Sequence, residues 1–137
     1  MSKLLKLLVF PVLVSSCGTT IEQPFHNYHE IKDRIIEWNQ LFSQSEEYYL
    51  VYFYSEKCGH CNEIKQDILN YYFESIAKMY FVCADYEVVT GPKADLKGID
   101  KLDEFYIFGT PFLLEVKDHK VLDYYAGPSE ILGFISI

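Results

Sequence analysis

Residues 50–61 read LVYFYSEKCGHC, an apolar run followed at once by two cysteines with two residues between them. Residues 49–54 are apolar throughout, which is typical of a central strand buried on both faces. Apolar residues recur at helical spacing after Cys61 and predict a helix up to Phe73. Two cysteines placed between a strand and a helix can open and close a disulfide, so Cys58 and Cys61 are the candidate redox pair.

The composition limits the classes of protein to which the chain can belong. Its 137 residues are enough for one domain with a real core, and 50% of them are hydrophobic and 17% aromatic, which excludes a disordered chain. The net charge of −8 makes a nucleic-acid partner unexpected. Four cysteines are too few and too unevenly placed for a scaffold held together by disulfides.

The N-terminal residues have the layout of a secretory signal. Lys3 and Lys6 precede an apolar core over 7–14 that is too short to span a membrane, and small residues then lead to Cys17. The last four of these residues, from Val14 to Cys17, resemble a bacterial lipobox, which implies cleavage before Cys17 and attachment of a lipid to its thiol. We therefore expect a signal peptide over 1–16, a tether over 17–27 and an extracytoplasmic, membrane-anchored lipoprotein. An ordinary cleaved signal of a secreted protein and a retained hydrophobic N-terminal helix are the alternatives.

The remaining chain, residues 28–137, reads as alternating helices and strands. The apolar positions between Tyr28 and Ser43 predict one amphipathic helix. Further strands are expected over 79–84, 111–116 and 121–125, with a polar loop over 86–98 and a short helix over 99–106. Gly127-Pro128 ends the last strand, and Ser129 is expected to cap a final helix that runs to the C-terminus.

This order of elements and three motifs resemble the thioredoxin-like fold family. The motifs are the strand–CxxC–helix of residues 50–61, the sequence Gly109-Thr110-Pro111 before the third strand, and Tyr125-Ala126-Gly127 before the last helix. The resemblance implies an α/β fold, a three-layer α/β/α sandwich with a central mixed four-stranded sheet. It also implies that Pro111 has a cis peptide bond and faces the dithiol. Backbone groups near Thr110 and Pro111 would then pair with an extended substrate peptide.

The position of each cysteine predicts its role. Only a thiolate attacks a disulfide, and a free cysteine has a pKa of about 8.5, so the site must lower that pKa. Cys58 lies just before a helix, whose N-terminal amides and dipole favour a negative sulfur, and Lys57 and His60 add positive charge. Cys58 is therefore the expected nucleophile, and Cys61, one turn further, is the resolving cysteine.

The two residues between the cysteines bear on the direction of electron flow. Gly59 and His60 match the pair found in protein disulfide isomerases, whereas thioredoxins carry Gly-Pro. An imidazole near the thiolate stabilises the reduced form. The reduction potential is about −180 mV in protein disulfide isomerase and about −270 mV in thioredoxin. The sequence favours an oxidase or isomerase over a reductase without deciding between them.

Some positions depart from the family pattern. Tyr52 stands where the family usually carries a buried Asp or Glu that accepts a proton from the second cysteine, and a tyrosine, with a pKa of about 10, is a poor base at neutral pH. The segment 86–98 looks like an insertion, and it leaves a strand on the side where the dithiol lies, so it could flank the substrate. Cys83, between Val82 and Ala84 in an expected strand, is interpreted as a small core residue.

Together these features predict a thiol–disulfide oxidoreductase that acts on protein or peptide disulfides outside the cytoplasm. It would be a monomer without cofactor or metal, and an unidentified redox partner would recycle its dithiol. Two alternatives remain open. One is a peptide-binding or secretion and assembly accessory module with little redox turnover, which Tyr52 and the insertion favour. The other is a metal-binding protein, although Cys83, His26 and His29 are not spaced as a second ligand pair.

Overall fold

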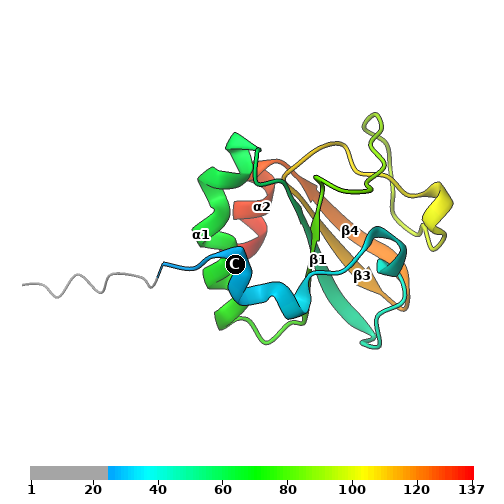
Figure 1. Ribbon diagram of the computed structural model, residues 1–137. Coiled ribbons are helices and arrows are strands. Elements are labelled where there is room, and N and C mark those ends of the chain that lie inside the picture. The colour runs from blue at the N-terminus through cyan, green and yellow to red at the C-terminus, as the bar shows by residue number, and fades with distance from the viewer. Residues whose placement is uncertain (1–24) are drawn as a thin grey trace, which may run out of the picture.

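A four-stranded mixed sheet forms the centre of the molecule in the computed structural model, which describes residues 25–137. Its strands are β1 (Tyr48–Tyr54), β2 (Met79–Cys83), β3 (Phe112–Lys117) and β4 (Lys120–Ala126), in the order β2-β1-β3-β4 (Figure 1). β1 pairs in parallel with β2 and antiparallel with β3, and β4 completes a hairpin with β3. The predicted mixed sheet is confirmed, and β1 lies in its interior because its side chains are apolar on both faces.

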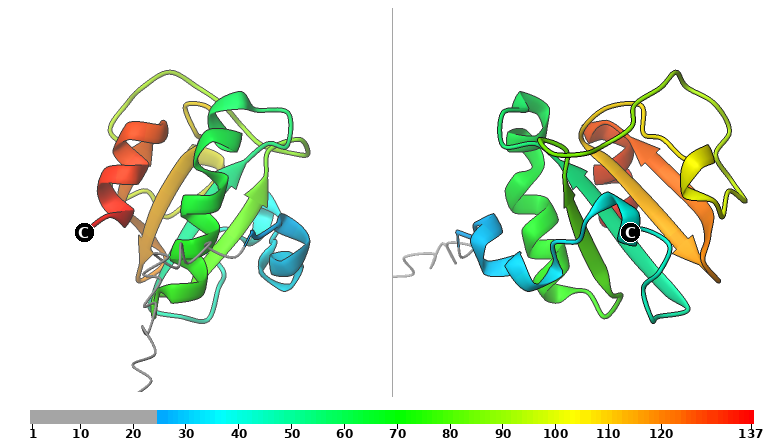
Figure 2. Two further views of the ribbon diagram at one scale, coloured as in Figure 1. Left: turned by 90° about the vertical axis from the view of Figure 1, so that its left-hand side faces the viewer. Right: turned by 45° about the vertical axis from the view of Figure 1, so that its right-hand side comes forward.

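Two α-helices cover one face of the sheet. The helix α1 (Gly59–Glu74) follows β1, and α2 (Pro128–Ile135) ends the chain beside it (Figures 1 and 2). Ile64, Ile68 and Leu69 of α1 are buried against this face, where every second residue of β1 meets them. Side chains point to the same face at every second residue of β1 and about every 3.6 residues of α1. The side chains on these two faces meet and form one core between the strand and the helix.

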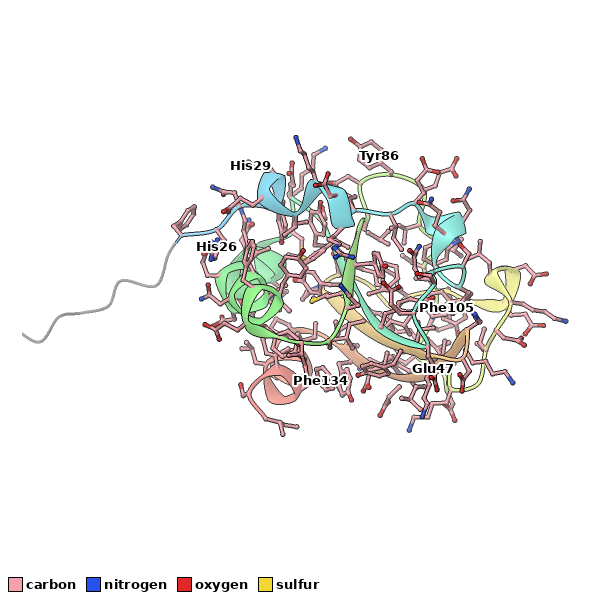
Figure 3. The ribbon with its side chains drawn as sticks, turned by 90° about the horizontal axis from the view of Figure 1, so that it is seen from below. His26, His29, Glu47, Tyr86, Phe105 and Phe134 are labelled. Atoms are coloured by element: carbon pink, nitrogen blue, oxygen red, sulfur yellow. A yellow bond between two sulfur atoms is a disulfide. The ribbon has the colours of Figure 1, made fainter. Side chains whose placement is uncertain are left out.

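The opposite face is covered by irregular chain and short 3₁₀ turns. Among the described residues, the only regular pieces there are η2 (Trp38–Gln40) and η3 (Leu102–Glu104). The ring of Phe105 is buried on this side, and Phe134 lies on the α2 side (Figure 3). The third layer of the predicted sandwich is thus present as packed coil, and the helix expected over 99–106 shortens to η3.

The single helix predicted between Tyr28 and Ser43 is wrong. A 3₁₀ segment, η1 (Tyr28–Arg34), is followed by extended chain, and the amide of Ile36 donates to the carbonyl of Phe81 at 2.8 Å. The segment crosses the outer edge of β2, so Ile31 is buried on the α1 face and Trp38 packs on the opposite one. The apolar residues recur at helical spacing, but they do not form one buried face of a helix. They are divided between the cores on the two faces of the sheet and the edge of β2.

The last helix starts one residue earlier than predicted and is capped differently. Gly127 is the N-cap with φ of 84°, a left-handed value that favours glycine, and Pro128 is the first helical residue. The side chain of Ser129 makes no cap, and the amide of Ala126 donates to the Glu130 carboxylate at 2.8 Å.

The N-terminal end of the described chain is attached to α1. The amide of His26 donates to the side chain of Gln66 at 2.9 Å, and that side chain donates back to the carbonyl of His26 at 2.8 Å. The ring of His26 packs against that of Phe73, with 4.3 Å between the ring centroids and 30° between the ring planes. The predicted signal peptide and Cys17 lie outside the described residues. Within residues 25–137, no helix is both long enough and apolar enough to cross a bilayer.

Candidate dithiol site

Cys58 and Cys61 lie where β1 passes into α1. Cys58 is the N-cap of α1, and its sulfur accepts a hydrogen bond from the amide of Cys61 at 3.1 Å. The two residues form a disulfide in this structure, with 5.2 Å between their Cα atoms. Cys58 is partly exposed, whereas Cys61 is fully buried. An incoming sulfur can therefore reach Cys58, while Cys61 can react only with its neighbour.

The loop before β3 approaches the same sulfur. The Thr110–Pro111 peptide bond is cis, as the family resemblance implies. The carbonyl oxygen of Thr110 lies 3.5 Å from Sγ of Cys58. The carbonyl of Pro111 accepts from the amide of Gly127 at 3.1 Å, which joins this loop to the start of α2. The structure thus brings together three motifs that lie far apart in the sequence.

The two residues between the cysteines lie at the surface. The ring of His60 is exposed, and its Nδ1 lies 3.4 Å from the Glu63 carboxylate, one turn along α1. A carboxylate at this distance offsets part of any positive charge on the ring. Gly59 is the first residue of α1, and nothing lies within 4 Å of where a side chain would begin. The structure therefore shows no steric need for glycine at this position.

A hydrogen-bonded pair that the sequence analysis missed holds the loop before Cys58. The hydroxyl of Ser55 donates to the Asp85 carboxylate at 2.6 Å and accepts from the amide of Lys57 at 3.2 Å. The Ser55 hydrogen bond lowers the pKa of Asp85. Parallel strands end at the same edge of a sheet, so the residues just after β1 and β2 could have been expected to meet.

Tyr52 is unsuited to accept a proton. It is fully buried, and neither its hydroxyl nor that of Tyr28 has a hydrogen-bond partner among the described residues. Burial raises the pKa of Tyr52 above the usual tyrosine range, and the neighbouring Tyr28 adds to the effect. Because a group must first lose its own proton to act as a base, Tyr52 remains a neutral phenol at physiological pH. The interpretation of this position as a departure from the family pattern is consistent with its environment.

Cys83 is less buried than the sequence analysis expected. It is the last residue of β2, is half-exposed, and donates to the Asp85 carboxylate at 3.6 Å. It lies on the wall of a hollow of about 770 Å³ at the outer edge of β2, together with Val82, Trp38 and Tyr86. The strand ends at Cys83, so the neighbours that would bury a residue within a strand are missing on one side.

The metal-binding alternative would need about four ligands close together, as zinc takes in proteins. No group of three or more His, Cys, Asp or Glu side chains lies close enough together there to hold a metal ion. Among residues 25–137, no third such side chain lies with Cys58 and Cys61.

Known structures resemble this arrangement of strands and helices. No protein-family model and no curated protein match the chain. The crystal structure of Fasciola hepatica thioredoxin covers 75% of this chain and 96% of its own at 16% identity, with a TM-score of 0.54. Thioredoxin structures from Schistosoma mansoni, at 16% identity, and Nicotiana alata, at 18%, each cover 75% of this chain with TM-scores of 0.50 and cover 96% and 90% of their own chains. The chain has the thioredoxin fold. At these identities the likeness shows the fold alone, so the chemistry has to be argued from the site.

Proposed function

We propose that this protein is a thiol–disulfide oxidoreductase that exchanges disulfides with proteins or peptides through Cys58 and Cys61. The observation that carries the proposal is the position of the pair. Cys58 caps α1 and is accessible, Cys61 is buried behind it, and the Thr110 carbonyl lies 3.5 Å from the Cys58 sulfur. A substrate chain that pairs with the backbone at Thr110 would bring its own sulfur to Cys58.

The exchange needs no cofactor. In the reducing direction the thiolate of Cys58 attacks one sulfur of the substrate disulfide, and the other substrate sulfur leaves as a thiolate that takes up a proton. Cys61 then loses its proton, attacks the Cys58 sulfur and releases the second substrate thiol. Two electrons pass to the substrate, and the pair ends as the disulfide of this structure. The reverse sequence oxidises a client dithiol.

The amide of Cys61 supports the first step, because it already points at the Cys58 sulfur from 3.1 Å. A hydrogen bond to an ionised acceptor is stronger than one to a neutral acceptor. The same bond is therefore worth more when Cys58 is a thiolate than when it is part of a disulfide.

We also propose an extracytoplasmic location, with the protein held at a membrane by a lipid on Cys17. The support is the signal-like sequence of residues 1–17. Labelling with a fatty acid in cells and mass analysis of the N-terminal peptide test it. A Cys17 that carries no lipid, in a protein recovered without detergent, would leave plain secretion as the explanation.

The test of the enzymatic proposal is a redox titration in graded glutathione buffers, followed by alkylation and peptide mass mapping of each cysteine. We expect Cys58 and Cys61 to change together in one reversible two-electron step, while the extent of alkylation of Cys83 stays the same in every buffer. A midpoint near or above about −200 mV would indicate an oxidase or isomerase, and one below about −250 mV a reductase. The absence of a reversible step would refute the proposal.

A peptide-binding module with little turnover is the second candidate, and Tyr52 is the observation that favours it. No carboxylate stands at this position to take the proton of Cys61, so the second step is expected to be slow. The double variant Cys58→Ser, Cys61→Ser separates the two candidates. A module would still hold a reduced, unfolded client and slow its aggregation, whereas an enzyme would lose its effect on the client's disulfides.

A further inference from the structure

The inserted segment 86–98 runs from the end of β2 across the sheet face opposite α1 and reaches β4 (Figure 2). It is fixed along its length by backbone hydrogen bonds. The amide of Gly91 donates to the carbonyl of Ile107 at 3.0 Å, and the amide of Gly98 donates to that of Val121 at 2.8 Å. Between these points the Tyr124 hydroxyl donates to the carbonyl of Ala94 at 2.9 Å. The segment therefore has a defined position relative to β3 and β4.

One part of this segment forms the wall of a hollow of about 380 Å³. The hollow is lined by Lys93, Ala94, Phe108, Tyr124, Ala126 and Glu130. The rings of Phe108 and Tyr124 meet edge to face at 5.6 Å and provide an apolar wall. Lys93 and Ala94 come from the insertion, so a thioredoxin fold without this segment would lack one side of the hollow.

The hollow adjoins the loop that approaches the dithiol. Phe108 belongs to the same turn as Thr110, whose carbonyl lies 3.5 Å from Sγ of Cys58. Ala126 pairs with Phe112, the residue after Pro111. A client segment whose cysteine reacts with Cys58 would therefore lie with its neighbouring residues near this hollow.

The charges around the hollow favour an acidic occupant. Glu130 also lines the hollow and keeps its negative charge, but its carboxylate accepts the amide hydrogen of Ala126 at 2.8 Å and lies in the first turn of α2, where the helix dipole offsets part of that charge. Lys97, further along the insertion, pairs with Asp123 at 3.8 Å. Lys93 is exposed and makes no ion pair with any described residue. Of the two charged side chains that line the hollow, only the ammonium group of Lys93 has no hydrogen bond or ion pair with a described residue.

We propose that this hollow is a specificity subsite, in which Lys93 binds an Asp or Glu side chain of the client segment that flanks the reactive cysteine. The stem of that side chain packs against Phe108 and Tyr124. The inference rests on the proposed function for its client, and it assigns to the insertion a task in client selection. Exchange of small disulfides that carry no flanking peptide does not involve this subsite.

Binding of peptides to the oxidised protein tests the subsite without any turnover. Two fluorescent peptides carry serine in place of the reactive cysteine and differ only in two neighbouring residues, which are Glu in one and Lys in the other. We expect the Glu peptide to bind more tightly, and Lys93→Glu to reverse the preference. Each exposed ion pair contributes up to about 1 kcal/mol, which corresponds to about fivefold in affinity. Lys93→Glu removes a pair with the Glu peptide and creates one with the Lys peptide, so the ratio of the two affinities should fall by up to about fivefold for each.

Lys97→Glu is the matched control, because it makes the same change of charge on the same segment outside the hollow. The ratio of its affinities for the Glu and the Lys peptide should stay close to that of the unmodified protein. An equal fall in both variants would show a general charge effect and overturn the subsite, as would the absence of any preference in the unmodified protein. Failure of the redox titration with the peptide preference intact would remove the enzymatic proposal and leave the subsite in place.

Discussion

The thiol of Cys83 is the clearest case of a residue whose reactivity is set by its surroundings. Burial raises the pKa of this thiol, and the Asp85 carboxylate adds to the increase because a second negative charge beside it is unfavourable. A raised pKa means less thiolate at a given pH. Cys83 should therefore react slowly at neutral pH, which fits a thiol that takes no part in exchange at the dithiol.

We expect Asp85→Asn to lower the pH at which Cys83 becomes reactive. Alkylation rates of the oxidised protein measured against pH should give a midpoint above the ordinary value of about 8.5, and the variant should move the midpoint down towards it. Glu87→Gln is the control, since Glu87 lines the same hollow without a hydrogen bond to the thiol. A midpoint that stays fixed in Asp85→Asn would show that burial alone sets the pKa.

Single residues also show how far the sequence could predict the site. The pairing of Cys58 with Cys61 follows from their spacing and from the strand and helix around them, and the structure joins the two in a disulfide. The contact of Thr110 with Cys58 was found only through the family resemblance, since nothing local links residues so far apart in the chain. The bond between Ser55 and Asp85 was missed because a serine and an aspartate at two strand ends have many ordinary roles.

At the scale of elements, β1, β3 and β4 are tied together by a buried carboxyl group. Glu115 of β3 is buried and accepts from the hydroxyls of Tyr48 at 2.7 Å and Tyr125 at 2.6 Å. Burial and the neighbouring Glu115 raise the pKa of both tyrosines above the usual range, so each keeps its proton and remains a donor. The carboxyl group thereby links the middle of β3 to the start of β1 and to the end of β4.

Tyr125→Phe should lower the free energy of unfolding by about 1–3 kcal/mol, because it leaves the buried carboxyl of Glu115 with one donor fewer. Tyr124→Phe on the same strand removes a hydroxyl bound to an exposed carbonyl, and about 0.5–1.5 kcal/mol is expected there. Urea unfolding followed by circular dichroism measures both values. Equal losses would mean that Glu115 is well hydrated once Tyr125 is gone.

The elements themselves were predictable to different degrees. The strands and α1 have strong periods and were found with small errors at their ends. The stretch from Tyr28 to Ser43 was misread because the period of its apolar residues fits a helix, while its isoleucines, branched at Cβ, fit extended chain equally well. The free edge of β2 offered the amide of Ile36 a partner in Phe81, and that tertiary contact decided the outcome.

For the whole molecule, the sequence predicted the sheet and its helical face but not the other face. The chain between β2 and β3 packs by aromatic contacts such as Trp38 with Phe105, at 5.4 Å between ring centres, and has little regular structure. Packing of this kind has no period that a sequence can display. The three motifs identified the fold because each lies where a regular element begins or ends: at the junction of β1 and α1, just before β3, and between β4 and α2.

Stability and redox poise of the whole molecule are linked through one thermodynamic cycle. The cycle consists of four steps, which are the folding of the reduced chain, the folding of the oxidised chain, and the oxidation of the pair in the folded and in the unfolded chain. The free energies of these steps sum to zero around the cycle. For every 30 mV by which folding raises the reduction potential of the pair, the free energy of unfolding of the reduced form must therefore exceed that of the oxidised form by about 1.4 kcal/mol. The amide of Cys61 points at the Cys58 sulfur only in the folded chain, and it favours the thiolate.

We therefore expect the reduced protein to be more stable to urea than the oxidised protein, by an amount that agrees with the potential from the glutathione titration. The potential of a peptide covering residues 56–63 supplies the value for the unfolded pair. His60→Pro introduces the Gly-Pro pair of thioredoxins. It should lower the reduction potential of the pair, and it should reduce the difference in free energy of unfolding between the reduced and the oxidised form. An oxidised form that is the more stable one would mean that the fold favours a reductase, with His60 too exposed and too close to Glu63 to stabilise the thiolate.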